Sequence, residues 1–242
     1  MPKQQMLRKK LLPEPVPVNM RKASTSDNFS YLLISLVFLL FASAGINQFY
    51  PSGEGQSLII AAIVITMITG IWSIRSTNHM FNTGLGLTVG VIVIAFISAL
   101  FDLAELDKLQ ILFLLIFFVM TLKVAARQAL FSGEVTVNSI VGSICIYLLL
   151  GLIWALLYAL ISQYIPDAFS GINHADWKQA FPDFVYFSFV VLTTLGFGDL
   201  LPVSPIARFL VSMEAIFGVF YMAIVVSSLV GARMATSSNN EK

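Results

Sequence analysis

Six segments of the chain are apolar enough, over a long enough run, to cross a lipid bilayer as helices. One crossing takes about 20 apolar residues, because the hydrocarbon core is about 30 Å thick and a helix rises about 1.5 Å per residue. Only 11% of the 242 residues are charged. The composition therefore predicts an all-α integral membrane protein with six transmembrane helices, at residues 31–49, 57–74, 83–101, 109–126, 139–164 and 205–230.

A seventh apolar segment, residues 184–194, has eleven residues and is too short to cross. A chain that turns back at membrane depth needs protein or water around the turn, because lipid cannot satisfy its backbone polar groups. We therefore expect a re-entrant helix between the fifth and sixth transmembrane helices.

The basic residues predict how the helices are oriented, because cytoplasmic loops carry an excess of Lys and Arg. With the N-terminus inside, only three of the 14 basic residues lie outside, namely Lys108, Lys178 and Arg208. This predicts a multi-pass protein of the cell membrane with both termini in the cytoplasm and with residues 193–199 in the outer half. The net charge of +1 argues against a nucleic-acid partner.

The sequence TTLGFGD lies between the fifth and sixth predicted helices. Gly196 and Gly198 permit backbone conformations with positive φ, which side chains disfavour. Alternating these glycines with Thr194, Leu195 and Phe197 can turn successive carbonyl groups in one direction. Four such segments around an axis would form stacked rings of oxygen atoms that replace the water around a dehydrated cation.

The run TLGFG resembles the TVGYG filter of tetrameric potassium channels. The match extends beyond these five residues, since an aromatic-rich segment, residues 184–189, precedes it and Asp199 follows it directly. The resemblance implies a selectivity filter and a pore module of three helices, an outer helix at 139–164, a pore helix at 183–193 and an inner helix at 205–230.

The resemblance also implies how potassium is bound and how the chain assembles. Carbonyl oxygens of Thr194, Leu195, Gly196 and Phe197 would coordinate the ion, and Gly198 would end the row. One filter segment per chain implies a homotetramer with a single central pore, surrounded by membrane lipid. Potassium is then the permeant ligand, no cofactor is expected, and the implied function is passive, potassium-selective conduction down the electrochemical gradient.

Side chains around the filter have expected roles as well. Asp199 lies at the outer mouth, where its charge would concentrate cations. Asp183 follows Pro182 and is expected to cap the pore helix, although a solvated loop carboxylate fits its position equally well. The register of the inner helix places four residues along the cavity below the filter, namely Val219, Met222, Val226 and Val230.

Glu214 and Gly218 are the candidates for gating on the inner helix. An ionisable group inside a membrane span is costly and marks a functional hypothesis. Glu214 either ties the inner helix to the back of the pore helix or senses protons. Gly218 lies one turn further along and resembles the family's hinge glycine, but a small residue suits close helix packing equally well.

The filter departs from the commonest family pattern at three positions. Phe197 replaces the usual tyrosine, and Phe187 lies where many relatives carry tryptophan, so two polar handles are absent and packing alone is expected to hold the filter. Val190 stands where some relatives place a glutamate that bonds the filter aspartate. Asp199 must therefore find water or another partner.

The first four predicted helices resemble a voltage-sensor bundle without its gating charges. Such sensors need several basic residues spaced three apart, and the fourth helix offers only Lys123 and Arg127, both at its inner end. With about a dozen residues after the sixth span, we expect no cytoplasmic sensing domain. The expected parts are a disordered cytoplasmic tail (1–28), a four-helix bundle (29–128), a pore domain (139–231) and a short cytoplasmic tail (232–242).

Two other functions remain open. The chain fits a non-conducting membrane regulatory or scaffold subunit that retains a pore-like loop, and potassium flux in liposomes would distinguish the two. It fits a potassium-uptake subunit less well, because those relatives carry four degenerate loops in one chain. An enzyme is disfavoured, because no nucleophile–base pair or metal-ligand spacing is present.

Overall fold

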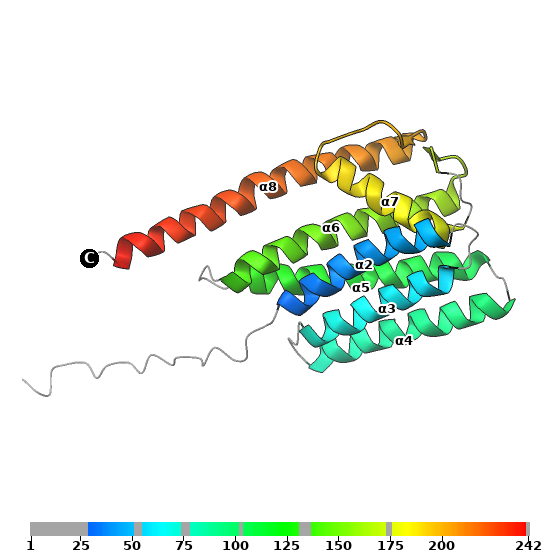
Figure 1. Ribbon diagram of the computed structural model, residues 1–242, viewed down its shortest axis with the longest axis horizontal. Coiled ribbons are helices and arrows are strands. Elements are labelled where there is room, and N and C mark those ends of the chain that lie inside the picture. The colour runs from blue at the N-terminus through cyan, green and yellow to red at the C-terminus, as the bar shows by residue number, and fades with distance from the viewer. Residues whose placement is uncertain are drawn as a thin grey trace, which may run out of the picture.

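The computed structural model describes residues 29–50, 55–73, 78–101, 104–130, 137–172 and 176–240. Six long helices run side by side along one axis (Figure 1). They are α2 (Phe29–Phe49), α3 (Gln56–Ser73), α4 (Asn78–Phe101), α5 (Ala104–Leu130), α6 (Val137–Tyr164) and α8 (Pro205–Asn240). Each contains a stretch of at least 18 residues that is apolar enough to span a membrane. The prediction of an all-α membrane protein with six spanning helices is confirmed.

Helix α7 (Trp177–Leu192) has 16 residues, or about 24 Å at 1.5 Å per residue. It begins at the end of the molecule where α6 ends and α8 begins, and it stops part-way along the neighbouring helices (Figure 1). The chain then returns to the same end, where β1 (Phe169–Ser170) pairs with β2 (Leu201–Pro202) as antiparallel strands. The residues between α7 and β2 are those of the TTLGFGD motif.

The predicted start of α7 is wrong. The helix begins at Trp177 instead of residue 183, and its N-cap is Asp176, whose side chain accepts a hydrogen bond from the backbone amide of Lys178 at 2.9 Å. Pro182 lies inside the helix and was misread as its boundary. Pro182 is the sixth residue of the helix, where it lacks the amide that would bond the carbonyl of Lys178, and the helix continues through it. Asp183 is therefore an interior residue of α7 and not its cap.

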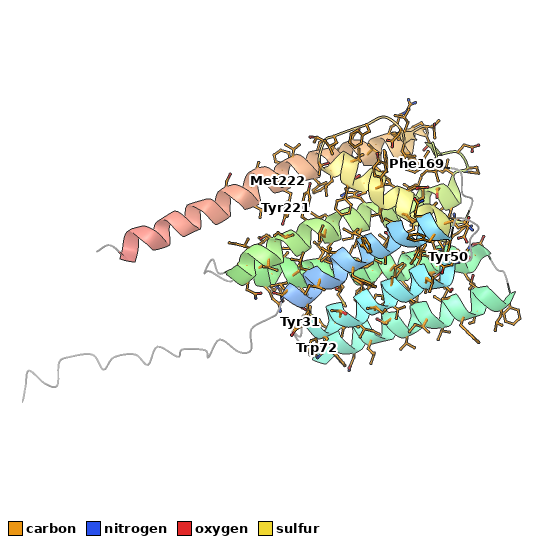
Figure 2. The ribbon with its side chains drawn as sticks, in the orientation of Figure 1. Tyr31, Tyr50, Trp72, Phe169, Tyr221 and Met222 are labelled. Carbon is orange, nitrogen blue, oxygen red and sulfur yellow. The ribbon has the colours of Figure 1, made fainter. Side chains whose placement is uncertain are left out.

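The first four helices and the later helices share one apolar core. Helix α5 lies along α6, and α2 contacts α3, α6 and α7. Buried Cys145 of α6 donates a weak hydrogen bond from its Sγ to the carbonyl of Phe29 in α2, at 3.5 Å. At the same end of α2, Tyr31 packs edge-on against Trp72 of α3, with ring centroids 5.4 Å apart (Figure 2). The bundle is thus packed directly against the helices that hold the motif.

Helix α8 is packed on one side only. Among the described elements its main contacts are with α6, α7 and β2. Only 17% of the residues in its 21-residue span are buried, compared with 61% of those in the span of α6. The exposed apolar side chains lie on several faces of the helix, at Ile206, Phe209, Ile216, Phe217, Val219, Phe220, Met222 and Ile224. A single chain therefore leaves most of α8 for lipid or other protein to cover.

Two expected tails have different outcomes. Residues 1–28, predicted to be a disordered tail, lie outside the described residues. The segment 232–242 was predicted to be a short tail, and helix α8 continues through it as far as Asn240.

Candidate functional site

The backbone of the TTLGFGD motif alternates in the sign of φ. Thr194, Gly196 and Gly198 have φ values of 60°, 58° and 82°, whereas neither Leu195 nor Phe197 has a positive φ. Positive φ costs glycine little, but it is uncommon for a β-branched residue such as threonine. Such alternation is what is needed to turn successive carbonyl groups in one direction.

The motif begins directly at the C-terminal end of α7. The amide of Thr194 donates to the carbonyl of Val191 and that of Leu195 to the carbonyl of Val190, both at 2.9 Å. The hydroxyl of Tyr147 in α6 donates to the carbonyl of Leu192 at 3.3 Å. The last turn of α7 is thus bonded both to the motif and to α6. Its carbonyl end carries partial negative charge, which favours a nearby cation.

Residues 193–199 are all exposed in the single chain. Their backbone therefore lies on the surface of one subunit and is not enclosed by its core. For Leu195 and Phe197 the exposed fractions are 61% and 67%. The described part of the chain therefore leaves one side of the motif uncovered.

The outer end of the motif is held by a hydrogen bond that was missed in the sequence. The hydroxyl of Tyr186 in α7 donates to the Oδ2 of Asp199 at 2.7 Å. This bond lowers the pKa of Asp199 below its ordinary value, because it stabilises the charged carboxylate. The expectation that packing alone holds the filter is therefore wrong. The available signal was that Tyr186 carries the one phenolic hydroxyl among the aromatic residues just before the motif.

The two short strands brace the same end. The amide of Val203, just after β2, donates to the carbonyl of Ala168, just before β1, at 2.8 Å. Gly171, with φ 94°, lies so close to the Asp199 carbonyl that a Cβ atom would overlap it. The guanidinium Nε of Arg208 donates to the carbonyl of Pro202 at 3.2 Å. The loop before α7 and the segment after the motif are therefore held together by hydrogen bonds and close packing.

Phe187 belongs to an aromatic cluster behind α7. Its ring centroid lies 5.4 Å from that of Tyr158 and 5.9 Å from that of Phe169. Phe184 completes the cluster, 5.4 Å from Phe169. Phe187 thus fills the back of α7 by packing.

Glu214 joins three helices. It is completely buried in α8. Its Oε1 lies 2.5 Å from the hydroxyl of Ser188 in α7, and its Oε2 accepts a hydrogen bond from the hydroxyl of Tyr158 in α6. The Ser188 hydroxyl also donates to the carbonyl of Gly151 in α6, at 2.8 Å. The carboxyl group thus lies in the buried interface of α6, α7 and α8.

Gly218 packs against the end of α7. A Cβ atom at this position would overlap the carbonyl oxygen of Leu192. Close packing is therefore sufficient to explain a glycine here, and the hinge role stays a prediction. Leu192, the residue that Gly218 contacts, lies two residues before Thr194 in the chain.

The predicted cavity-lining residues are only partly described. Val219 and Met222 are exposed in the single chain. The side chains of Val226 and Val230 lie outside the described set. Figure 2 shows Tyr221 and Met222 part-way along α8. Tyr221 bonds the carbonyl of Ser143 at 2.5 Å and so marks the face of α8 that lies against α6.

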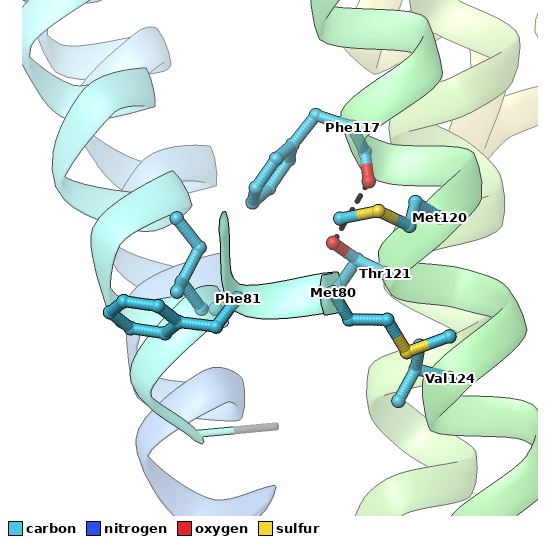
Figure 3. Close-up of a pocket in the computed structure, with 8 residues that line it drawn as sticks. Met80, Phe81, Phe117, Met120, Thr121 and Val124 are labelled. Atoms are coloured by element: carbon cyan, nitrogen blue, oxygen red, sulfur yellow. Dashed lines mark hydrogen bonds between the residues drawn. The ribbon is translucent and has the colours of Figure 1, made fainter. Parts of the chain in front are cut away.

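An apolar pocket of about 30 Å³ lies elsewhere, between α3, α4 and α5 (Figure 3). Thr121 is its main polar lining residue, and its hydroxyl is already bonded to the carbonyl of Phe117 at 2.9 Å. None of the predicted site residues lines the pocket. In the described part of the chain no group of three His, Cys, Asp or Glu residues is arranged to hold a metal ion.

Comparison with known proteins gives two matches. Residues 142–234 match a family model described as an ion channel. A curated relative, the inward rectifier potassium channel Kirbac3.1 of Paramagnetospirillum magnetotacticum, is 34% identical over 88 residues. The aligned part is 36% of this chain and only 27% of the relative, so the chain spans about a quarter of that protein's length. No solved structure matches the chain.

The family match begins in α6, includes α7 and the TTLGFGD motif, and ends in α8. These are the elements that the geometry brings together around the alternating backbone. Residues 142–234 are therefore similar to an ion-channel family over the part of the chain that contains the motif, and the potassium channel named above is similar over part of its length.

Proposed function

We propose that this channel is a potassium-selective homotetramer with one central pore, in which Thr194–Gly198 form the selectivity filter. The observation that carries the proposal is the alternating φ of Thr194, Gly196 and Gly198 at the end of α7. Rings of backbone carbonyls built this way replace the hydration shell of potassium. The relative's description as a potassium channel supports the same ion.

The unpartnered surfaces of the single chain support a tetramer. The motif and most of α8 are exposed, and they are adjacent, since α8 packs on α7. Closed symmetric assembly would cover both surfaces at once. The start of α2 and the end of α8 lie at the same end of the molecule (Figure 1), which supports placing both termini in the cytoplasm.

The oligomeric state is the first test. Chemical cross-linking of the purified protein in detergent is expected to give a ladder that ends at four chains. Particle images are expected to have fourfold symmetry around the motif. A protein that stays monomeric in both measurements would contradict the proposal.

Replacing Gly196 with alanine is expected to abolish potassium-selective flux. Within one chain no atom lies within 4 Å of the position a Cβ would take, so the strain inside the subunit comes from the positive φ of 58°. A left-handed residue with a side chain costs roughly 1–2 kcal/mol, and the assembly contains four copies. The measurement is potassium and sodium flux into liposomes.

The matched control is Gly86→Ala in α4. This position is also open within 4 Å but has no positive φ. It is expected to keep wild-type flux and selectivity. Equal potassium and sodium flux in Gly196→Ala and Gly86→Ala would mean that residues 194–198 do not select the ion. A wild-type protein that gives no potassium flux would instead favour a regulatory or scaffold subunit.

Removing the Tyr186 hydroxyl is expected to make the channel more sensitive to acid. The hydrogen bond holds the pKa of Asp199 below its ordinary value of 3.8, so its stabilising effect is present above that value and is lost as the pH falls through the lowered pKa. In Tyr186→Phe the carboxylate is protonated at a higher pH. As the external pH is lowered, the potassium flux of Tyr186→Phe should therefore begin to fall at a higher pH than that of the control Tyr50→Phe. Identical pH curves for the two variants would exclude a role of the Tyr186 hydroxyl in keeping Asp199 charged.

The hydrogen bonds around Glu214 favour a neutral carboxyl group. Ser188 has one hydroxyl proton, and both the Gly151 carbonyl and Glu214 Oε1 lie within bonding distance. The carbonyl can only accept. A proton on the Glu214 carboxyl lets Ser188 bond both groups, while Tyr158 donates to Oε2. We therefore infer that Glu214 is a structural tie between α6, α7 and α8 and not a proton sensor.

Glutamine is expected to replace Glu214 without loss, because its amide donates and accepts as a neutral carboxyl does. Glu214→Gln should keep the tetramer, its conduction and any pH response. Glu214→Leu leaves the buried Tyr158 hydroxyl without its acceptor, at a cost of about 1–3 kcal/mol, while Ser188 keeps only its bond to the Gly151 carbonyl. It should lower the temperature at which the tetramer dissociates. Loss of a clear pH dependence in the glutamine variant would instead favour proton sensing.

A further inference from the structure

An ion pair joins the first four helices to the pore helix α7 at the outer end of the molecule. The Nζ of Lys178, in the first turn of α7, lies 2.7 Å from the Oδ1 of Asp107, in the first turn of α5. Both side chains are mostly buried, with exposed fractions of 11% and 18%. The hydroxyl of Ser98 in α4 donates to the same carboxylate oxygen at 3.2 Å. Three helices therefore meet at one carboxylate.

Two buried polar groups without partners lie beside this pair. Gln110 is one turn from Asp107 on the same face of α5 and is completely buried, and neither its Oε1 nor its Nε2 has a hydrogen-bond partner among the described residues. The indole Nε1 of Trp177, next to Lys178, is likewise buried and unpartnered in that set. The Lys178 ammonium lies 5.7 Å from the Trp177 ring centroid, so the indole adjoins the ion pair.

Burial of unpartnered polar groups is costly, and native proteins commonly satisfy such groups with internal water. A carbonyl oxygen, an amide nitrogen and an indole nitrogen beside an ion pair supply both donors and acceptors for water. We propose that Ser98, Asp107, Gln110, Trp177 and Lys178 form a hydrated polar junction through which the first four helices set the position of α7 and, with it, the filter. This role rests on the proposed channel function.

The route from the junction to the filter is short and rigid. Helix α7 is a single 16-residue element with Lys178 in its first turn. Further along, its Tyr186 bonds Asp199 at the outer end of the filter, and the carbonyls of Val190 and Val191 accept from the amides of the inner end. A displacement of Lys178 is therefore transmitted to both ends of the filter. The first four helices would thus act on the filter through α7 at the outer end of the molecule, and this action would need no gating charges that move across the membrane.

The test compares two ion pairs of equal length in the full-length protein. Asp107→Asn and Lys178→Gln break the junction. The control Glu105→Gln breaks the 2.7 Å pair between Glu105 and Lys108, which lies within α5 and is exposed on the glutamate side. Hydrogen exchange of the α7 amides is expected to be about tenfold faster in the junction variants and unchanged in the control. The rate at which potassium flux declines during sustained conduction should change in the same variants only.

Two further variants complete the design. The exchanged pair Asp107→Lys with Lys178→Asp is expected to recover part of the lost protection. If water links the Gln110 amide to the junction, Gln110→Leu should speed hydrogen exchange of the α7 amides as Asp107→Asn does. If the amide simply has no partner, Gln110→Leu should be more stable than the wild type. Ser98→Ala removes only the hydrogen bond to Asp107, so it should speed α7 exchange by a smaller factor. It replaces the charge variants in the test if those do not assemble.

Unchanged α7 exchange in both Asp107→Asn and Ser98→Ala would overturn the proposal, and so would a Gln110→Leu protein with wild-type exchange and higher stability. Exchange is measured without conduction. A junction that protects α7 in a protein without potassium flux would therefore refute the proposed function and leave the structural junction standing.

Discussion

A helix that ends inside a membrane must have its last backbone groups satisfied by protein, because lipid offers them no hydrogen bonds. The end of α7 meets this constraint with the amides of Thr194 and Leu195 and with the hydroxyl of Tyr147. Gly218 lets α8 approach the same carbonyl end closely. The conformation of the motif, the position of α8 and the packing of α6 all meet at this one end of α7.

Hydropathy located the six long helices, because the thickness of a bilayer sets their length whatever their packing. The motif could also be recognised, since its glycines are needed for a backbone conformation that is local in the chain. The start of α7 was missed because Pro182 was taken as a boundary, although the helix begins five residues earlier at Trp177 and continues through the proline.

Contacts between distant residues could not be predicted from one sequence. Tyr186 and Asp199 are 13 residues apart and meet only because the chain reverses after α7. Asp107 and Lys178 are separated by 71 residues, and no local pattern pairs them. For Glu214 the sequence indicated a tie to the pore helix, and the structure adds its partners Ser188 and Tyr158. Such pairs need the relative placement of helices, which side-chain periodicity alone does not determine.

In the proposed channel, the strained backbone of Thr194 would make the filter depend on its own ion. Its φ of 60° is uncommon for a β-branched residue, so the segment stores conformational strain where it begins. A bound cation attracts the carbonyls that this conformation aligns, and a ligand that binds only one conformation stabilises that conformation by mass action. In the proposed tetramer, the permeant ion is then part of the structure that selects it. Depleting potassium from both sides would let the strained residues relax, so the closed state of such a filter can arise from an empty pore without any movement of α8.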